Sequence, residues 1–267
     1  IFVITVAVAE VGGRLLAFVG GQQTGGVWDV TEAPRSLGDF GTDTVVYSAA
    51  WVGRTVLFGT LEGDVRRVDF ADAAAPSALP SLQTESGTLV KSLVAADDWV
   101  LAGGPGNAAI LFSTSGQRLA DLPIPGRMMA ASVSPDGTEV LGGFARGGAI
   151  LWQVTRDDLG QPAFLPRSAL ALPTNIHSVL HGGDEIYAAG AFGEVQEYSR
   201  TGELQRRWPA RNAVVSLAVS GRQLLVGSTE GITDAWPLAA PNLVAVMPAG
   251  QQAYDLTHGG DVVLVGT

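Results

Sequence analysis

The sequence contains no cysteine, and this absence removes several classes of chemistry. Disulfide bonds, zinc sites built on thiolates and cysteine nucleophiles are all excluded. Lysine is almost absent too: it occurs once, at Lys91, beside fifteen arginines. Charged residues make up only 16% of the chain, and the formal net charge is −10. Because nonspecific affinity for nucleic acid comes from neutralising phosphates with cations, this charge argues against a nucleic-acid partner.

Two sequence patterns are also missing. No run of about 18 apolar residues is present, so the sequence predicts no membrane insertion. No stretch repeats its apolar residues at the 3.6-residue period of an amphipathic helix, so almost no helix is expected. Hydrophobic residues make up 46% of the chain, and 35 of its 267 residues are glycine. This composition favours buried strands joined by many tight turns over disorder.

A short unit recurs along the chain. Its clearest copy is the stretch 214–238, where three apolar runs are separated by glycine-containing breaks, a pattern typical of antiparallel strands. In several copies a serine of the first strand stands eleven or twelve residues before a glycine of the second. These pairs are Ser48 and Gly59, Ser92 and Gly103, Ser178 and Gly190, and Ser216 and Gly227. The copies start near residues 5, 45, 89, 129, 176, 213 and 252.

The copies recur about every 41 residues, and a period of this length with several strands per copy predicts a propeller blade. We expect an all-β fold, a seven-bladed β-propeller of four-stranded antiparallel blades, that occupies residues 1–267 as a single domain. The seventh copy reaches only its second strand at Thr267. We therefore expect the last blade to be incomplete in this chain and the chain to be part of a larger protein, fused to other domains.

Residue size within the copies follows the geometry expected of a blade. First strands converge on an axis, and they carry small residues such as Ala49 and Ala50. Third strands carry a larger apolar residue at one matched position, where it would fill the wedge between neighbouring sheets. These residues are Trp28, Val68, Phe112, Trp152, Tyr198 and Trp236.

Two short motifs are similar to those of a known family. The dipeptide Trp28-Asp29 and the turn Ser134-Pro135-Asp136-Gly137, together with the period, make the chain resemble a divergent WD-repeat β-propeller of bacterial type. In that family, partners commonly contact side chains around the start of each first strand. The resemblance therefore implies a binding face there. Our candidate binding residues at these positions are Tyr47, Lys91, Met129, Asn175, His177 and Tyr254.

Motifs for catalysis or metal binding are not found. His177 and His181 have the spacing of a metal-binding pair on a helix, but on a strand residues four apart lie about 13 Å apart, too far for one ion. Paired carboxylates such as Asp157-Asp158 fall in expected turns. No phosphate-binding P-loop, serine-hydrolase elbow or zinc-protease motif is present. We predict no cofactor, no metal site and no enzymatic activity.

The sequence thus favours a noncatalytic interaction, sensor or scaffold module that presents a propeller surface to a protein or peptide partner. The alternative is a propeller enzyme or a small-molecule binder that uses the central channel. An enzyme would need charged or metal-binding groups converging at the channel mouth, where this chain offers mainly serine, tyrosine and apolar residues. A purely structural alternative is that the candidate binding residues only plug a water-filled channel.

Overall fold

The structure is a computed structural model that describes residues 3–40, 43–72, 75–84, 88–172, 176–191, 193–210, 212–238, 245–248, 255–259 and 262–266. Over these residues the backbone forms strands, turns and bends and no helix, as the sequence predicted. Accordingly, no described segment is a helix long and apolar enough to cross a membrane. The all-β class is confirmed.

The chain divides into two compact units. Unit 1 comprises Ile1–Pro123 and Thr257–Gly266, and unit 2 comprises Ile124–Leu256 and Thr267. Each unit contains three four-stranded antiparallel sheets, and every sheet is built from four strands that follow one another in the chain. The prediction of one domain over residues 1–267 stays a prediction.

Unit 1 contains the sheets that we call blades 1, 2 and 3. Blade 1 comprises β1 (Val3–Val11), β2 (Arg14–Gly21), β3 (Thr24–Asp29) and β4 (Arg35–Asp39). Blade 2 comprises β5 (Val46–Val52), β6 (Thr55–Thr60), β7 (Asp64–Asp69) and β8 (Ser77–Gln83). Blade 3 comprises β9 (Ser92–Ala96), β10 (Trp99–Gly103), β11 (Ala108–Ser113) and β12 (Arg118–Pro123).

Unit 2 contains blades 4, 5 and 6. Blade 4 comprises β13 (Met128–Val133), β14 (Glu139–Phe144), β15 (Ala149–Arg156) and β16 (Pro162–Leu170). Blade 5 comprises β17 (Ile176–His181), β18 (Glu185–Gly190), β19 (Glu194–Ser199) and β20 (Leu204–Pro209). Blade 6 comprises β21 (Val214–Ser220), β22 (Gln223–Ser228), β23 (Ile232–Pro237) and β24 (Ala245–Pro248).

The seventh copy is a two-stranded sheet of β25 (Asp255–Gly259) and β26 (Val262–Gly266). The described residues therefore form six four-stranded blades, and the predicted count of seven is corrected to six. The physical reason is that a blade needs four strands in register, whereas the described part of the seventh copy supplies two. Four-stranded antiparallel blades, the other part of the prediction, are confirmed.

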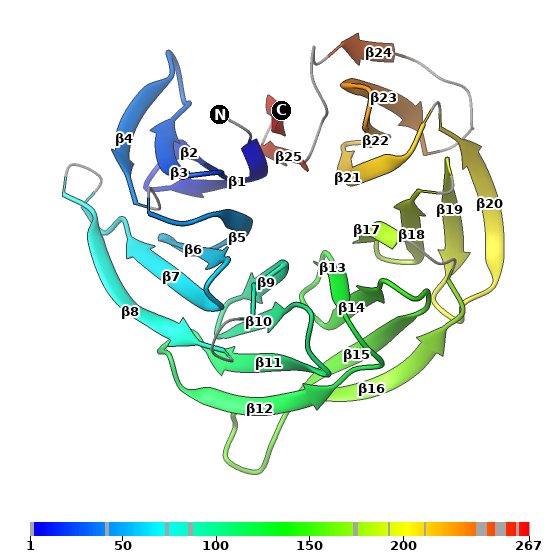
Figure 1. Cartoon of the computed structure of the whole chain (residues 1–267), viewed down its shortest axis with the longest axis horizontal. Helices are drawn as coiled ribbons and strands as arrows, with labels where there is room; N and C mark the ends of the chain where they lie inside the picture. The colour runs from blue at the N-terminus through cyan, green and yellow to red at the C-terminus, as the bar shows by residue number, and fades with distance from the viewer. Residues whose placement is uncertain are drawn as a thin grey trace. The chain divides into compact units, whose positions relative to one another are not determined.

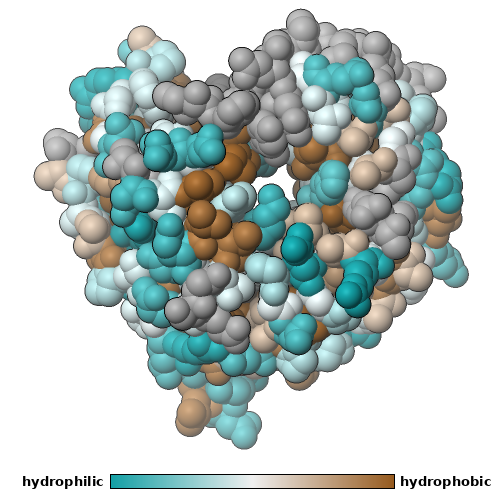
Figure 2. Space-filling model, in the orientation of Figure 1, coloured by the Kyte–Doolittle hydropathy of each residue, from teal (hydrophilic) through white to brown (hydrophobic). Residues whose placement is uncertain are grey.

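Within each unit the blades are arranged as in a β-propeller. The first strands of successive blades lie side by side, β1 with β5 and β5 with β9 in unit 1, and β13 with β17 and β17 with β21 in unit 2 (Figure 1). In each unit the fourth strands lie farthest from these inner strands (Figure 1). Figure 2 shows a group of hydrophobic residues over β1 and β5. The small residues predicted for the first strands thus lie where neighbouring blades come closest.

The large residues of the third strands pack against the preceding blade, as expected for a wedge. Phe112 shares a buried cluster with Leu57 of blade 2, and the Trp236 ring lies 6.1 Å from the Trp208 ring of blade 5. Trp28 is the exception, because the residue is 39% exposed. Val27, the preceding residue of β3, packs against blade 2. Because successive side chains of a strand point to opposite faces of the sheet, Trp28 lies on the face of blade 1 that is directed away from blade 2.

The serine–glycine pairs predicted from the sequence are cross-strand partners in three blades. Ser48 faces Gly59, Ser92 faces Gly103 and Ser216 faces Gly227. Blade 5 differs, since Ser178 faces Ala189 and Gly190 faces Ile176. Gly190, the last residue of the second strand of blade 5, lies one position after Ala189. An alignment of the copies on this glycine is therefore displaced by one residue in blade 5.

Glycine at this second-strand position leaves room for a side chain of the next blade. A methyl group added at Gly59 would lie 2.5 Å from Val90 Cγ1 and 2.6 Å from Ser48 Oγ. A methyl group at Gly20 would lie 2.7 Å from Val46 Cγ1. Both distances are well inside van der Waals contact. We call this space the glycine notch. We call the apolar residue that fills it, a valine in both of these cases, the anchor, because its side chain determines how closely two blades approach.

The notch predicts a stability difference between two glycine substitutions in unit 1. Gly59→Ala should lower the free energy of unfolding by about 1–3 kcal/mol, the usual cost of overpacking a filled site. Gly106→Ala is the matched control, because its methyl group would meet only Ala108 backbone atoms at 3.7 Å or more. Urea unfolding of both variants measures the difference. Equal stability of the two variants would show that the notch does not limit blade packing.

Candidate functional site

Most first strands begin with an irregularity that frees one residue from the ladder of cross-strand pairs. In β5, Val46 faces Thr60 and Ser48 faces Gly59, so Tyr47 between them has no partner. Met129 in β13 and His177 in β17 stand in the same position. A bulge of this kind releases the extra residue from pairing and redirects its side chain. Three of the predicted binding residues are therefore the bulge residues of their blades.

The residue before each bulge residue is buried in the core. Val46, Met128, Ile176 and Val214 are completely buried, and Val90, which holds this place in blade 3, is 2% exposed. The residues that follow them, Tyr47, Met129, His177, Val215 and Lys91, are all partly exposed. Core packing thus requires an apolar residue at the anchor and places no such demand on its neighbour. Met129 holds this second position because Ala130, not Ser132, faces Gly143.

In unit 1 the structure brings two predicted binding residues together. The ammonium group of Lys91 lies 5.4 Å from the centroid of the Tyr47 ring, a cation–π contact between blades 2 and 3. Lys91 follows the anchor Val90, whose amide donates to the carbonyl oxygen of Thr60 at 2.9 Å. The carbonyl oxygen of Val90 accepts from Ser48 Oγ at 3.1 Å. The backbone that carries Lys91 is therefore held on both sides.

In unit 2, Met129 and His177 lie on the neighbouring inner strands β13 and β17. Nδ1 of His177 lies 3.1 Å from the carbonyl oxygen of Val214, the anchor of blade 6. Because a carbonyl oxygen only accepts, Nδ1 carries the hydrogen in this contact. The remaining candidates, Asn175 and Tyr254, lie outside the described residues.

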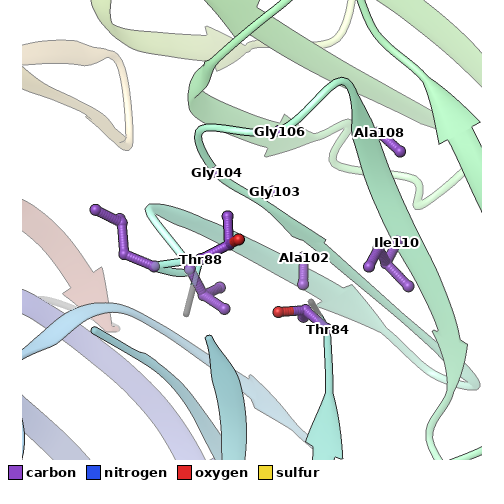
Figure 3. Close-up of a pocket in the computed structure, with 10 residues that line it drawn as sticks. Thr84, Thr88, Ala102, Gly103, Gly104, Gly106, Ala108 and Ile110 are labelled. Atoms are coloured by element: carbon purple, nitrogen blue, oxygen red, sulfur yellow. The ribbon is translucent and has the colours of Figure 1, made fainter. Parts of the chain in front are cut away.

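A pocket lies beside Lys91 in unit 1 (Figure 3). Its cavity volume is small, about 20 Å³, and it was not predicted from the sequence. One wall is the segment Thr88–Val90 that leads into Lys91, and the opposite wall is the glycine-rich loop Gly103–Gly106. Thr84 and the side chains of Ala102, Ala108 and Ile110 complete the lining (Figure 3).

A second cluster, in unit 2, is the nearest approach of the described residues to a catalytic arrangement. Glu139 is 1% exposed, and its carboxylate accepts from Arg200 at 2.5 Å, from Arg167 at 2.7 Å and from His181 Nε2 at 3.0 Å. Burial would raise the pKa of Glu139, but the hydrogen bonds from Arg200 and His181 bring it below its usual value. We call these four residues the Glu139 cluster.

The Glu139 cluster lacks a nucleophile. His181 is 3% exposed, and its second ring nitrogen, Nδ1, already accepts a hydrogen bond from the Gly183 amide at 3.2 Å. A histidine that activates a serine must have that nitrogen directed at the serine hydroxyl. Ser132 Oγ instead accepts from the backbone amide of His181 at 3.0 Å. The cluster therefore holds blades 4 and 5 together and offers no general base to a substrate.

Metal binding finds no support in the described part of the chain. His177 and His181 lie at opposite ends of β17, as the strand spacing predicted. Among the described residues, no group of three or more histidine or acidic side chains could hold a metal ion. The Glu139 cluster itself was missed by sequence reasoning, because its members come from four separate segments of the chain.

Comparison with known proteins adds no family to this description. No protein-family model matches the chain, and no curated protein sequence matches it.

The Glu139 cluster predicts acid sensitivity. Burial lowers the pKa of His181, although Glu139 opposes the change, so the unfolded chain binds a proton here more readily than the folded chain. Stability should therefore fall as the pH drops below about 6.5, the ordinary histidine pKa. Glu139, with its lowered pKa, acts in the same direction at lower pH.

His181→Gln tests this, because glutamine can still donate to Glu139 but does not titrate. The variant should lose less stability than the wild type between pH 7.5 and 5, as measured by urea midpoints. His177→Gln, at the other end of the same strand, should keep the wild-type dependence. Parallel profiles for all three proteins would exclude His181 as the titrating group.

Proposed function

We propose that the chain is a noncatalytic interaction module that presents the starts of its first strands to a protein or peptide partner. The observation that carries the proposal is the contrast between anchor and bulge residue. Anchors are uniformly apolar and buried, whereas their neighbours are tyrosine, lysine, methionine, histidine and valine at half-buried positions. Because packing does not dictate these side chains, their variety suits recognition. Tyrosine in particular is enriched among residues that dominate binding energy.

The same proposal includes a family assignment finer than the fold. We infer a WD-repeat-like propeller of bacterial type, with seven copies and a setting within a larger sensor or scaffold protein. Its support is the Ser134–Gly137 turn, in which Ser134 Oγ donates to Asp136 Oδ1 at 2.6 Å and the Gly137 amide donates to the Ser134 carbonyl at 2.9 Å. The Thr138 amide and hydroxyl also donate to Asp136. The hydrogen bond from Ser134, followed by these two from Thr138, lowers the Asp136 pKa to about 2.

Catalysis or small-molecule binding in a central channel is the alternative, and it would need several ionisable groups that converge. At the described first-strand starts the ionisable side chains other than tyrosine are Lys91 and His177, and each already has a contact within its own unit. The pocket beside Lys91, with a cavity volume of about 20 Å³, is far smaller than a typical small-molecule site. These observations favour a surface that contacts a protein or peptide over a cavity that encloses a ligand.

The experiment is a selection of displayed random peptides on the immobilised chain, followed by affinity measurements on variants. Peptides enriched by the wild type should bind Tyr47→Ala or His177→Ala at least about tenfold more weakly, equivalent to about 1.4 kcal/mol. Leu204→Ala and Leu165→Ala serve as controls, because both leucines are exposed on outer strands. Circular dichroism and urea unfolding confirm that the variants are folded.

Two results would reject the proposed function. One is a selection that enriches no peptide above an unrelated immobilised protein. The other is a set of enriched peptides that bind the inner-strand variants and the wild type equally. Loss of binding in the outer-strand controls instead would place the recognition surface on the fourth strands.

A further inference from the structure

A larger pocket lies at the end of blade 1 where β1 finishes, and we call it the Arg14–Arg35 pocket. Its cavity volume is about 340 Å³, at the lower end of the roughly 300–1,000 Å³ typical of small-molecule sites. Arg14, the first residue of β2, faces Val11, the last residue of β1. The pocket is therefore at the opposite end of the blade from a first-strand start. Its lining residues are Arg14, Asp29, Thr31, Glu32, Ala33 and Arg35.

Three of these lining residues share one face of blade 1. Asp29 of β3 pairs with Arg35 of β4 on one side and with Leu16 of β2 on the other. Residues directly opposite each other on paired strands lie on the same face of the sheet. Arg14 precedes Leu16 by two residues, so its side chain points to that face too. The Asp29 carboxylate thus lies between two arginines, with Arg14 Nη1 3.8 Å from its Oδ2.

A threonine occupies the other oxygen of the Asp29 carboxylate. Oδ1 accepts from the Thr31 amide at 3.1 Å and from the Thr31 hydroxyl at 2.7 Å. The same hydroxyl accepts from the Leu15 amide at 2.9 Å, which holds it in place. In the described part of the chain, Arg14 forms no hydrogen bond to Asp29, because 3.8 Å is beyond hydrogen-bond distance. The donors of its guanidinium group therefore remain available to a ligand.

The corresponding aspartate of blade 2 shows what the threonine hydroxyl changes. Asp69 also accepts from the amide two residues later, that of Ala71, at 3.1 Å. Ala71 has no hydroxyl, and Arg54 of the neighbouring hairpin donates instead, with Nε 2.9 Å from Asp69 Oδ1. The cross-strand partner of Asp69 is Ser77, so no second arginine stands opposite this aspartate. Blade 1 thus has a pair of open arginines where blade 2 has one closed ion pair.

The charges of the Arg14–Arg35 pocket are balanced in number. Glu32 and Arg35 are both exposed, and neither side chain forms a hydrogen bond or an ion pair within the part of the chain that the structure describes. Two arginines and two carboxylates line the pocket, so its wall is neutral overall and carries both signs. Complementary charge selects a ligand that also carries both signs.

We propose that the Arg14–Arg35 pocket binds a small zwitterion of the amino-acid or dipeptide class. The carboxylate of the ligand pairs with Arg14 and Arg35, because the planar donors of a guanidinium group match the two oxygens of a carboxylate. The ammonium group of the ligand pairs with Glu32. This site goes beyond the proposed interaction function, and either can hold without the other, because different residues form them.

A ligand with only negative charge fits this pocket less well. The chain has a formal net charge of −10, and the Glu32 carboxylate stands at the pocket wall without a direct partner. Both repel a simple anion. An ammonium group on the same ligand converts Glu32 from a repulsive into an attractive neighbour, so the carboxylate and the amine select the ligand together.

The test is an NMR titration of the ¹⁵N-labelled chain with three ligand mixtures. The first contains amino acids and dipeptides with both ends free, the second the same molecules acetylated at the amino end, and the third the same molecules amidated at the carboxyl end. The Nε–Hε signals of Arg14 and Arg35 report binding, and that of Arg54 is the internal reference. The free mixture should bind at least about tenfold more tightly than either blocked mixture, the loss expected for one charged hydrogen-bonded pair.

Two variants separate the charges of the pocket. Glu32→Gln should remove the preference for a free amino end and keep the preference for a free carboxyl end. Arg35→Gln should weaken binding of the free mixture at least about tenfold, as read from the Arg14 signal. Arg54→Gln is the matched control, because it removes an equal charge from an exposed arginine of blade 2, and it should leave binding unchanged.

A third variant tests the role of the threonine hydroxyl. Thr31→Ala reproduces the arrangement of blade 2, where Ala71 leaves the aspartate oxygen to an arginine. Arg14 should then close onto Asp29, and binding of the free mixture should weaken. Urea unfolding checks that each variant is folded. Arg35→Gln changes an exposed side chain without a direct partner, so it remains a valid test if Thr31→Ala proves unstable.

Three results would overturn the inference. One is a titration in which the Arg14 and Arg35 signals move no more than the Arg54 signal. Another is equal binding of the free and the acetylated mixtures, which would show a carboxylate site without selection for the amine. The third is unchanged binding of the free mixture to the Arg35→Gln variant.

Discussion

The packing of an apolar anchor into a glycine notch on the preceding blade is the contact on which each unit depends. Val46 fills the space at Gly20, Val90 fills the space at Gly59, and Ile176 and Val179 lie against Gly143. A methyl group at Gly20, Gly59 or Gly143 would lie 2.7 Å or less from the nearest atom of these side chains, whereas blade 5 has Ala189 opposite its serine. Farther from the inner strands the gap between blades widens, and large residues such as Phe112 fill it. The propeller arrangement follows from this gradient of residue size.

The same contact determines which residues are free to take part in recognition. An anchor such as Val90 is fixed by its buried side chain and by hydrogen bonds at both its amide and its carbonyl. Where a bulge follows the anchor, as at Tyr47, the next residue leaves the ladder and its side chain turns away from the core. A residue whose identity is constrained by core packing is therefore followed directly by a residue whose identity is not. Rigid backbone beneath variable side chains is a favourable design for binding, because little order is lost on association.

The sequence predicted the repeating parts of this architecture because they are local. The period, the strand breaks and the serine–glycine spacing depend on residues close together in the chain, and three of four such pairs are cross-strand partners. Errors arose where one blade departs from the pattern: Ala189 takes the place of glycine opposite Ser178, and Ala130 takes the place of serine opposite Gly143. The pocket beside Lys91 and the Glu139 cluster are formed by residues that are far apart in the sequence. Short sequence motifs do not predict contacts of this kind.

The two histidines of β17 show how one strand can serve two roles. His177, at the start of the strand, is partly exposed and contacts the anchor of blade 6, whereas His181, at its end, is buried in the Glu139 cluster. A buried ion network adds little stability by itself, but it penalises any packing that leaves a charge without its partners. The cluster therefore fixes the alignment of blades 4 and 5 at one end of their inner strands. At the other end, about 13 Å away by strand geometry, side chains can change without disturbing that alignment, and we place the recognition surface there for this reason.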